Sequence, residues 1–156
     1  MVKTSHLVAS LILGFLSTTT VFSQSIRSIT TKYQSADDFK TISSYFANGS
    51  DTGQRIINRS QENAWNGMYF IIEFTDRPET FSKKLSVLVD VLTPFSPKPK
   101  QYVFTLPSSD VFTWESYFGI TGSDWPNPEV NPLAWKVSIK DFEGSLIAEK
   151  QSFLWE

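Results

Sequence analysis

Alternation of apolar and polar residues, in segments the length of one β-strand, is the sequence feature that most constrains the fold. In residues 85–92, valine occupies positions 87, 89 and 91, while Ser86 and Asp90 occupy two of the intervening positions. Successive side chains of a strand point to opposite faces of a sheet, so this segment would have one apolar face. The pattern favours an antiparallel sheet that is buried on one side.

Similar segments recur along the chain and are separated by turn signals. Residues 68–75 are almost continuously apolar at their start, which predicts a central strand covered on both faces. Residues 24–38 alternate only weakly and are expected to form an edge strand or a loose arm. Six further strands are predicted, at 39–46, 54–60, 101–106, 113–120, 133–140 and 145–155. The first two of these six would form one hairpin, and the last two would form another.

Prolines mark the connections between these strands. Pro94, Pro97 and Pro99 interrupt the chain after 85–92, because proline cannot donate to a strand ladder. Further prolines make 121–132 an irregular connection. No segment between residue 24 and the end of the sequence shows sustained helical periodicity. The sequence therefore predicts an all-β chain, an immunoglobulin-like antiparallel β-sandwich of about 7–8 strands. The chain resembles immunoglobulin domains in architecture only, since it has no cysteine for their disulfide.

The N-terminal region has the three parts of a secretory signal peptide. Lys3 gives a basic start, residues 7–16 form an apolar run, and a polar stretch leads to Ser23. A membrane-spanning helix needs roughly 20 apolar residues, so the run is too short for an anchor. We expect cleavage after Ser23, which leaves Gln24 as the mature N-terminus and 24–156 as a single β-sandwich domain.

Removal of the leader, residues 1–23, changes the charge of the chain. The full sequence has 14 basic and 16 acidic residues, and the leader removes Lys3, so the mature balance is 13 − 16 = −3. This charge argues against nucleic acid or an anionic membrane surface as a partner. We expect a secreted or periplasmic protein without a transmembrane segment, stabilised by packing of its aromatic residues.

The mature chain lacks the residues that most enzymes use for catalysis. Its single histidine, His6, belongs to the predicted leader, and the chain has no cysteine. A Ser-His-Asp triad, a Cys-His pair and an ordinary zinc site therefore lack their parts. The sequence also carries no phosphate loop, nucleophile elbow or dinucleotide fingerprint. We expect a non-enzymatic protein that needs no cofactor.

Carboxylate pairs are the catalytic groups that remain. Asp76 with Glu79, or Asp110 with Glu115, would supply the two acids of a glycosidase. All four positions adjoin predicted turns, where acidic residues are common because they are solvated and favour bends. The turn is the simpler explanation of both pairs.

Metal binding would have to use oxygen ligands, which are typical of calcium sites. Asp141 and Glu143 resemble half of such a site. A turn that ends at Gly144 explains both residues without an ion. The sequence therefore predicts no metal site.

The loop around Trp125 is the strongest candidate for a ligand site. Sugar-binding modules stack an exposed aromatic ring on the sugar while neighbouring polar groups, here Asp124 and Asn127, hold the hydroxyls. In the competing interpretation, Trp125 folds back to cap the sandwich and Asp124 bonds to its own turn, since large aromatic residues are mostly buried. The same two interpretations apply to Trp65 and Trp114.

Three functions remain open from the sequence. The leading hypothesis is an exported protein that binds or supports another protein or a surface polymer. The second is a carbohydrate-binding module, and the third is a glycosidase with two acids about 5–9.5 Å apart. They predict, respectively, an exposed apolar patch, a row of exposed aromatic rings and a groove that holds paired acids.

Overall fold

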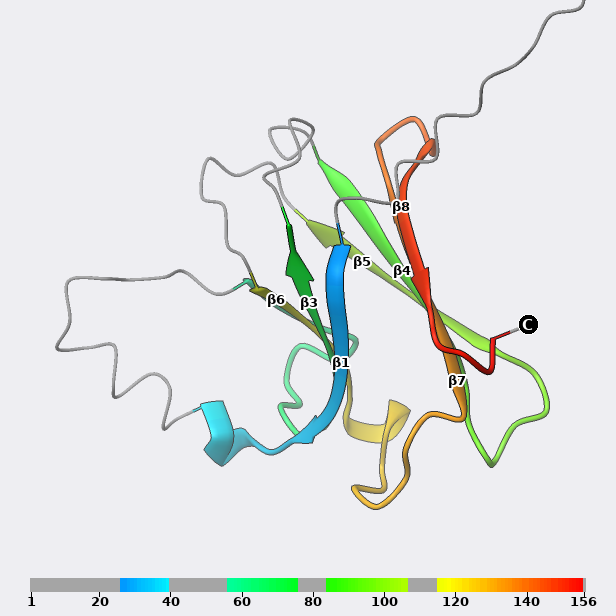
Figure 1. Cartoon of the computed structure of the whole chain (residues 1–156). Coiled ribbons are helices and arrows are strands. Elements are labelled where there is room, and N and C mark those ends of the chain that lie inside the picture. The colour runs from blue at the N-terminus through cyan, green and yellow to red at the C-terminus, as the bar shows by residue number, and fades with distance from the viewer. Residues whose placement is uncertain (1–25, 40–55, 76–83, 107–114, 156) are drawn as a thin grey trace, which may run out of the picture.

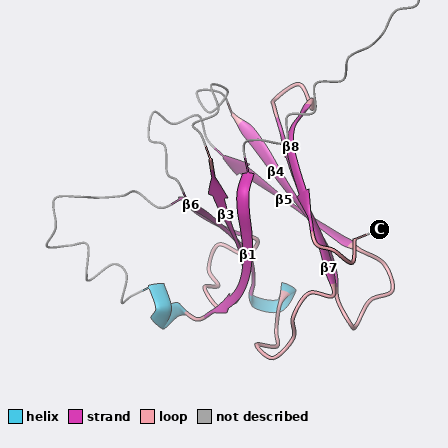
Figure 2. Ribbon diagram, in the orientation of Figure 1, coloured by secondary structure: helices cyan, strands magenta, loops and turns pink. Residues whose placement is uncertain are grey.

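The computed structural model describes residues 26–39, 56–75, 84–106 and 115–155. These residues form two four-stranded β-sheets that face each other (Figure 1). Helix is confined there to one turn at 36–39 and a short 3-10 turn, Gly122–Asp124 (Figure 2). The prediction of an all-β chain is confirmed.

The first sheet has the strand order β1-β3-β6-β2. Its strands are β1 (Ile26–Gln34), β2 (Ile56–Arg59), β3 (Gly67–Phe74) and β6 (Glu115–Thr121). β3 lies between β1 and β6, antiparallel to both, and is buried over most of its length, as its apolar sequence predicts. β1 is an edge strand, which confirms one of the two expectations for this segment.

β2 is the exception to antiparallel pairing, because it runs parallel to β6. The expectation of a wholly antiparallel sandwich is therefore wrong at this edge. A strand reaches a parallel neighbour only through a connection longer than a hairpin turn. The alternation of residues within a strand does not show whether its neighbour is parallel or antiparallel. The predicted strand 39–46 lies outside the described residues except for Phe39, which ends the helical turn.

The second sheet has the order β5-β4-β7-β8, and all its pairs are antiparallel. Its strands are β4 (Leu85–Leu92), β5 (Lys100–Leu106), β7 (Ala134–Lys140) and β8 (Leu146–Gln151). The valines at positions 87, 89 and 91 of β4 are all buried, so the alternation in this strand predicts its inward face correctly.

The main hydrophobic core lies between the two sheets. Both sheets contribute large apolar side chains to it, and Trp125 enters it from the loop after β6. The fully buried members include Met68, Phe70, Ile72, Leu85, Val87, Val89, Leu106, Phe118, Ile120 and Val137. Burial of apolar surface on this scale is the main source of stability in a chain without disulfides.

A second, smaller cluster covers the outer face of the first sheet. Phe39, Tyr69, Ile71 and Tyr117 are buried there. Gly119 pairs with Tyr69 across β3 and β6, and a Cβ atom at Gly119 would lie 2.5 Å from Cε1 of Tyr69. Glycine is therefore required under this ring, because any side chain would displace it.

One further strand prediction is confirmed, and another needs correction in length. The segment 113–120, expected to be a short strand, forms β6, which lies in the middle of the first sheet and is buried. The last strand was expected to reach Trp155 but ends at Gln151. A turn follows, in which the amide of Trp155 donates to the carbonyl of Ser152. Backbone pairing with β7 ends one residue after Gln151, where the N–H of Ser152 donates to the carbonyl of Trp135.

Loops 60–66, 93–99 and 122–133 leave the strands at the same end of the sandwich (Figure 1). The turn 141–145 and the N-terminal end of β4 lie at the opposite end. Within the described part of the chain, no helix has the length and apolar character needed to cross a membrane.

Candidate functional site

The three residues predicted as a ligand site lie together at one end of the sandwich. Asp124, Trp125 and Asn127 line a pocket of about 340 Å³. The other lining residues come from the same loop and from the loop between β4 and β5, and they are Thr93, Phe95, Pro126 and Val130. The pocket is therefore formed by a loop within the second sheet and by the loop that connects the first sheet to the second.

Trp125 anchors this site in the core. Its side chain is only 4% exposed, and its indole Nε1 donates to the backbone carbonyl of Val130 over 3.2 Å. The structure thus matches the interpretation in which the tryptophan folds back to close the end of the sandwich. Such a ring offers too little surface for a sugar to stack on it.

Asp124 is held by neighbours on two sides. Its Oδ1 atom accepts a hydrogen bond from Nζ of Lys100 over 2.8 Å, and its Oδ2 atom accepts one from Nε2 of Gln61 over 3.5 Å. Burial alone would raise the pKa of this carboxyl group. Hydrogen bonds from Lys100, Ser60 and Gln61, together with the charge of Lys100, outweigh burial and lower the pKa below its ordinary value.

Lys100 connects the two loops that form the pocket. It is the first residue of β5, and its ion pair with Asp124 joins the second sheet to the loop that leaves the first. The hydrogen bond to Asp124, supported by Tyr102, raises the pKa of Lys100 to about 12. The lysine side chain is 61% exposed, so solvent weakens this pair and its main effect is positional.

The segment before β3 fixes the start of the site loop. Gln61 donates to the hydroxyl of Ser123 over 2.6 Å, and its backbone N–H donates to the hydroxyl of Thr121. Gly122 follows with φ of +62°, and a Cβ atom there would lie 2.3 Å from Oε1 of Gln61. Glycine allows both the left-handed backbone and the close approach of the glutamine.

Asn127 shapes the far side of the loop. Its side-chain Oδ1 accepts a hydrogen bond from the backbone N–H of Glu129 over 2.9 Å, which is an Asx turn. The carbonyl of Asn127 accepts a further bond from Val130. Most polar groups at the predicted site thus serve the loop itself.

Phe95 is the exposed aromatic residue of the site, and its proline-rich segment, 94–100, was interpreted from the sequence as an interstrand loop. It is 74% exposed and lies on a loop in which the hydroxyl of Ser96 donates to the carbonyl of Lys98. A phenylalanine between two prolines in a predicted loop was a usable signal of exposure. The ion pair of Lys100 had no sequence signal, since its partner is 24 residues away.

Several other candidates are not part of this site. Asp76, Glu79, Asp110 and Trp114 lie outside the described residues. Glu115 begins β6 and accepts a hydrogen bond from the hydroxyl of Tyr117. Each glycosidase pair therefore includes at least one residue outside the described part of the chain, and both pairs stay predictions.

Trp65 is 39% exposed, but its ring already has a partner, the guanidinium of Arg59, 3.8 Å from the ring centroid. Asp141 accepts hydrogen bonds from the backbone N–H groups of Glu143 and Ser145, which is the turn expected without an ion. Among the described residues, no group of three or more metal-ligating side chains comes together.

The geometry of the pocket suits an apolar ligand group. Asp124 and Asn127 already have hydrogen-bond partners within the protein, whereas Phe95 and Pro126 present apolar surface to solvent. No protein family model, curated protein or solved structure matches this chain. Function is therefore inferred from the pocket and the sequence.

Proposed function

We propose that this chain is an exported, non-enzymatic β-sandwich that binds another protein through the pocket between loops 93–99 and 122–130. The supporting observation is the combination of an exposed phenylalanine, Phe95, with an apolar pocket whose floor includes the buried Trp125. A side chain of the partner would enter the pocket and pack against both aromatic residues. Such an aromatic-lined anchor point is typical of protein interfaces.

The chemistry of the pocket favours a protein over a sugar. A sugar site needs hydrogen-bond donors and acceptors that face the ligand, as well as a flat exposed ring. Here the Trp125 indole N–H, both carboxylate oxygens of Asp124 and the Asn127 Oδ1 already have partners within the protein. An apolar side chain needs none of these groups.

Export is proposed from the leader, residues 1–23. The non-enzymatic role is proposed because the chain after residue 23 has no histidine or cysteine. The carboxylate-based glycosidase remains the weaker alternative, and it would require an acid pair that the described residues do not assemble.

We also propose that the sandwich is immunoglobulin-like, which the strand order supports. If β2 is set aside, the first sheet contains the first, second and fifth strands, as in immunoglobulin domains. The second sheet contains the third, sixth and seventh strands, again as in those domains. The fourth strand, β5, lies beside β4 in the second sheet, and the parallel strand β2 occupies the edge that the fourth strand would otherwise take.

A photo-crosslinking amino acid placed at position 95 tests the proposed site in the natural host. We expect a covalent adduct with one specific protein, because a partner side chain would lie against this position. The same probe at position 142 is the matched control, since Phe142 is also exposed but lies in the turn at the opposite end of the sandwich. The partner identified in this way is then purified for affinity measurements.

Phe95→Ala should weaken binding of that partner by at least about tenfold, as expected for an aromatic residue at the centre of an interface. Its circular dichroism and melting temperature should remain those of the wild type. Adducts of the same protein from positions 95 and 142, or equal affinity of Phe95→Ala, would refute the proposal. Saturable binding of a polysaccharide that Phe95→Ala abolishes would instead establish the carbohydrate alternative.

A further inference from the structure

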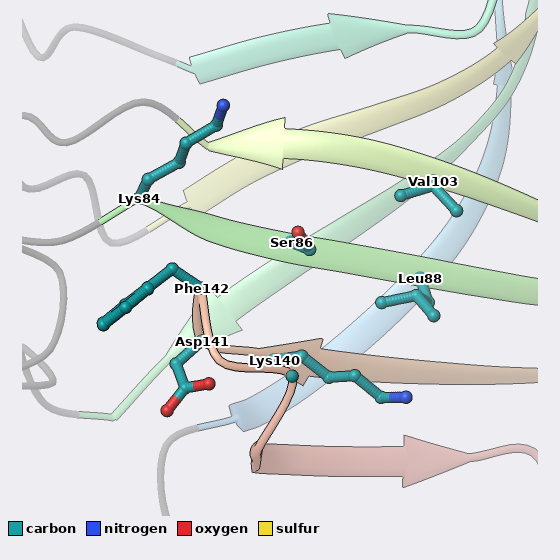
Figure 3. Close-up of a pocket in the computed structure, with 8 residues that line it drawn as sticks. Lys84, Ser86, Leu88, Val103, Lys140, Asp141 and Phe142 are labelled. Atoms are coloured by element: carbon teal, nitrogen blue, oxygen red, sulfur yellow. The ribbon is translucent and has the colours of Figure 1, made fainter.

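A second pocket lies on the outer face of the second sheet, far from the site described above (Figure 3). It has a volume of about 480 Å³ and is lined by side chains of β4, β5 and β7 and by the turn after β7. The lining residues are Lys84, Ser86, Leu88, Val103, Lys140, Asp141, Phe142 and Gly144. We refer to it as the outer-face pocket.

The outer-face pocket combines an apolar floor with a cationic rim. Leu88 and Val103 are cross-strand partners and form the floor, and Val103 is exposed. Lys84 and Lys140 stand on opposite sides of this floor, with their ammonium groups pointing away from each other (Figure 3), and neither has an ion pair among the described residues. The carboxylate of Asp141 already accepts two backbone N–H groups of its own turn. A ligand that matches this pocket would be apolar and carry a negative charge.

The turn after β8, residues 152–155, carries Phe153, the most exposed large apolar side chain of the described chain, and a second exposed apolar residue, Leu154. Phe153 is 92% exposed and Leu154 is 68% exposed. The sequence continues with an acidic residue, Glu156. This segment, which we call the tail, therefore has the two properties that the outer-face pocket requires, apolar side chains and an adjacent negative charge.

The tail is held away from the outer-face pocket of its own molecule. The hydroxyl of Ser152 accepts a hydrogen bond from the backbone N–H of Trp135, and the backbone N–H of Ser152 donates to the carbonyl of Trp135. Trp155 is fixed near Lys136, whose Nζ lies 5.8 Å from the ring centroid. Lys140, at the pocket, pairs with the opposite end of β8. A six-residue strand spans about 20 Å, so tail and pocket lie at opposite ends of the hairpin.

We propose that the tail of one molecule binds the outer-face pocket of a second copy, so that this chain associates with itself head to tail. Phe153 and Leu154 would cover Leu88 and Val103, and the two lysines at the rim would attract the negative charge that follows them in the sequence. One contact would thereby cover two exposed apolar surfaces that the single molecule leaves open. This inference is independent of the pocket between loops 93–99 and 122–130.

A head-to-tail contact uses a different surface on each molecule, so it leaves a free tail and a free pocket at the two ends of every assembly. Assemblies should therefore grow with concentration instead of stopping at a dimer. The interface is small, which places the expected dissociation constant between about 1 µM and 1 mM.

Sedimentation velocity of the purified exported protein over this concentration range tests the proposal. We expect the mean sedimentation coefficient of the wild type to rise continuously with concentration. The tail variant, Phe153→Ser with Leu154→Ser, and the pocket variant, Lys84→Glu with Lys140→Glu, should each weaken association by at least about tenfold. The matched control, Lys32→Glu with Lys98→Glu, has the same charge change at exposed lysines elsewhere and should behave as the wild type.

An equimolar mixture of the tail variant and the pocket variant provides the decisive measurement. The tail variant retains an intact pocket and the pocket variant an intact tail, so the mixture should form one-to-one complexes that grow no further. A wild type that stays monomeric up to about 1 mM would overturn the proposal. Undiminished association of either variant, or a mixture that stays monomeric, would overturn it as well. Circular dichroism of each variant confirms that it folds.

Discussion

Two aromatic residues that line the same pocket have different roles. Trp125 is buried in the core, whereas Phe95 is mostly exposed at the rim. Trp125→Ala would leave a cavity and should lower the free energy of unfolding by about 3–5 kcal/mol. Phe95→Ala removes little buried surface and should change it by no more than about 0.5 kcal/mol. Urea denaturation of both variants measures the difference, and similar losses would contradict these roles.

Tyr69 makes the stability of the protein sensitive to alkaline pH. Its buried hydroxyl donates to the carbonyl of Trp65 over 2.7 Å, and burial raises its pKa to about 12, against a small opposing effect of Arg59. Tyrosine ionises near pH 10 in the unfolded chain. The contribution of Tyr69 to the free energy of unfolding is therefore complete below about pH 10 and is lost as the pH rises to about 12. The expected loss from this residue is about 2–3 kcal/mol.

Comparison of wild type with Tyr69→Phe at pH 9 and pH 12 isolates this contribution. At pH 9 the variant should be less stable by about 1 kcal/mol, because it lacks one hydrogen bond. At pH 12 the order should reverse or the gap should close, since phenylalanine does not ionise. Lys100 also has a raised pKa but is present in both proteins, so its effect cancels. A pH-independent gap would show that Tyr69 ionises normally.

At the residue level, the sequence predicted which side chains gather at the site but not how they are oriented. Asp124, Trp125 and Asn127 are close in the chain, so any loop would bring them near each other. Whether Trp125 faces solvent depends on the open end of the sandwich that it fills, and this end is formed by residues from both sheets. Phe95 lies 30 residues before Trp125 in the chain. Strand pairing brings its loop to the site, and local sequence patterns do not encode that pairing.

At the level of the elements, the ion pair between Lys100 and Asp124 keeps the two site loops together. Asp124→Asn should lower stability by less than about 1 kcal/mol at pH 7, because the lysine is largely exposed. Since the pKa of Asp124 is lowered in the folded protein, its contribution is present above the unfolded value near pH 4 and disappears on acidification. The difference between wild type and variant should therefore vanish near pH 2.

Thermal denaturation at both pH values checks this expectation, with Glu129→Gln on the same loop as the matched control. The control should match the wild type within about 0.5 kcal/mol at either pH. A deficit of Asp124→Asn that persists at pH 2 would mean that its shape, and not its charge, supports the loop.

A continuous apolar run predicted β3, and the spacing of the valines predicted β4. Burial alternates strictly along β4 because its inner face meets the core and its outer face does not. β6 gave a weaker signal because Ser116 and Gly119 interrupt its apolar residues, although almost the whole strand is buried. The parallel partner of β2 was not predictable, since four residues carry no information about direction.

At the scale of the whole molecule, the proposed role depends on removal of the leader. Intact-mass analysis of the exported protein should give the mass of a chain that begins at Gln24. We expect this chain to retain the β-rich circular dichroism spectrum of the full domain, because all core strands lie after residue 25. A mass that includes residues before Gln24 would contradict the predicted cleavage.

At this scale the two sheets support the two loops that form the proposed binding pocket. The sheets bury a continuous core, while loops 93–99 and 122–130 at one end present the exposed apolar surface. Neither loop should need to refold on binding, since hydrogen bonds within the protein already fix the polar groups of the longer one. Binding should therefore protect the loops and leave the strands unchanged.

Hydrogen–deuterium exchange of the protein, alone and with the partner identified from position 95, is the most direct test of the binding pocket. We predict slower exchange in residues 93–99 and 122–130 when the partner is bound, with unchanged exchange in β4 and β7. Protection confined to other surfaces, such as the turn 141–145, would contradict the assignment of this pocket as the binding site.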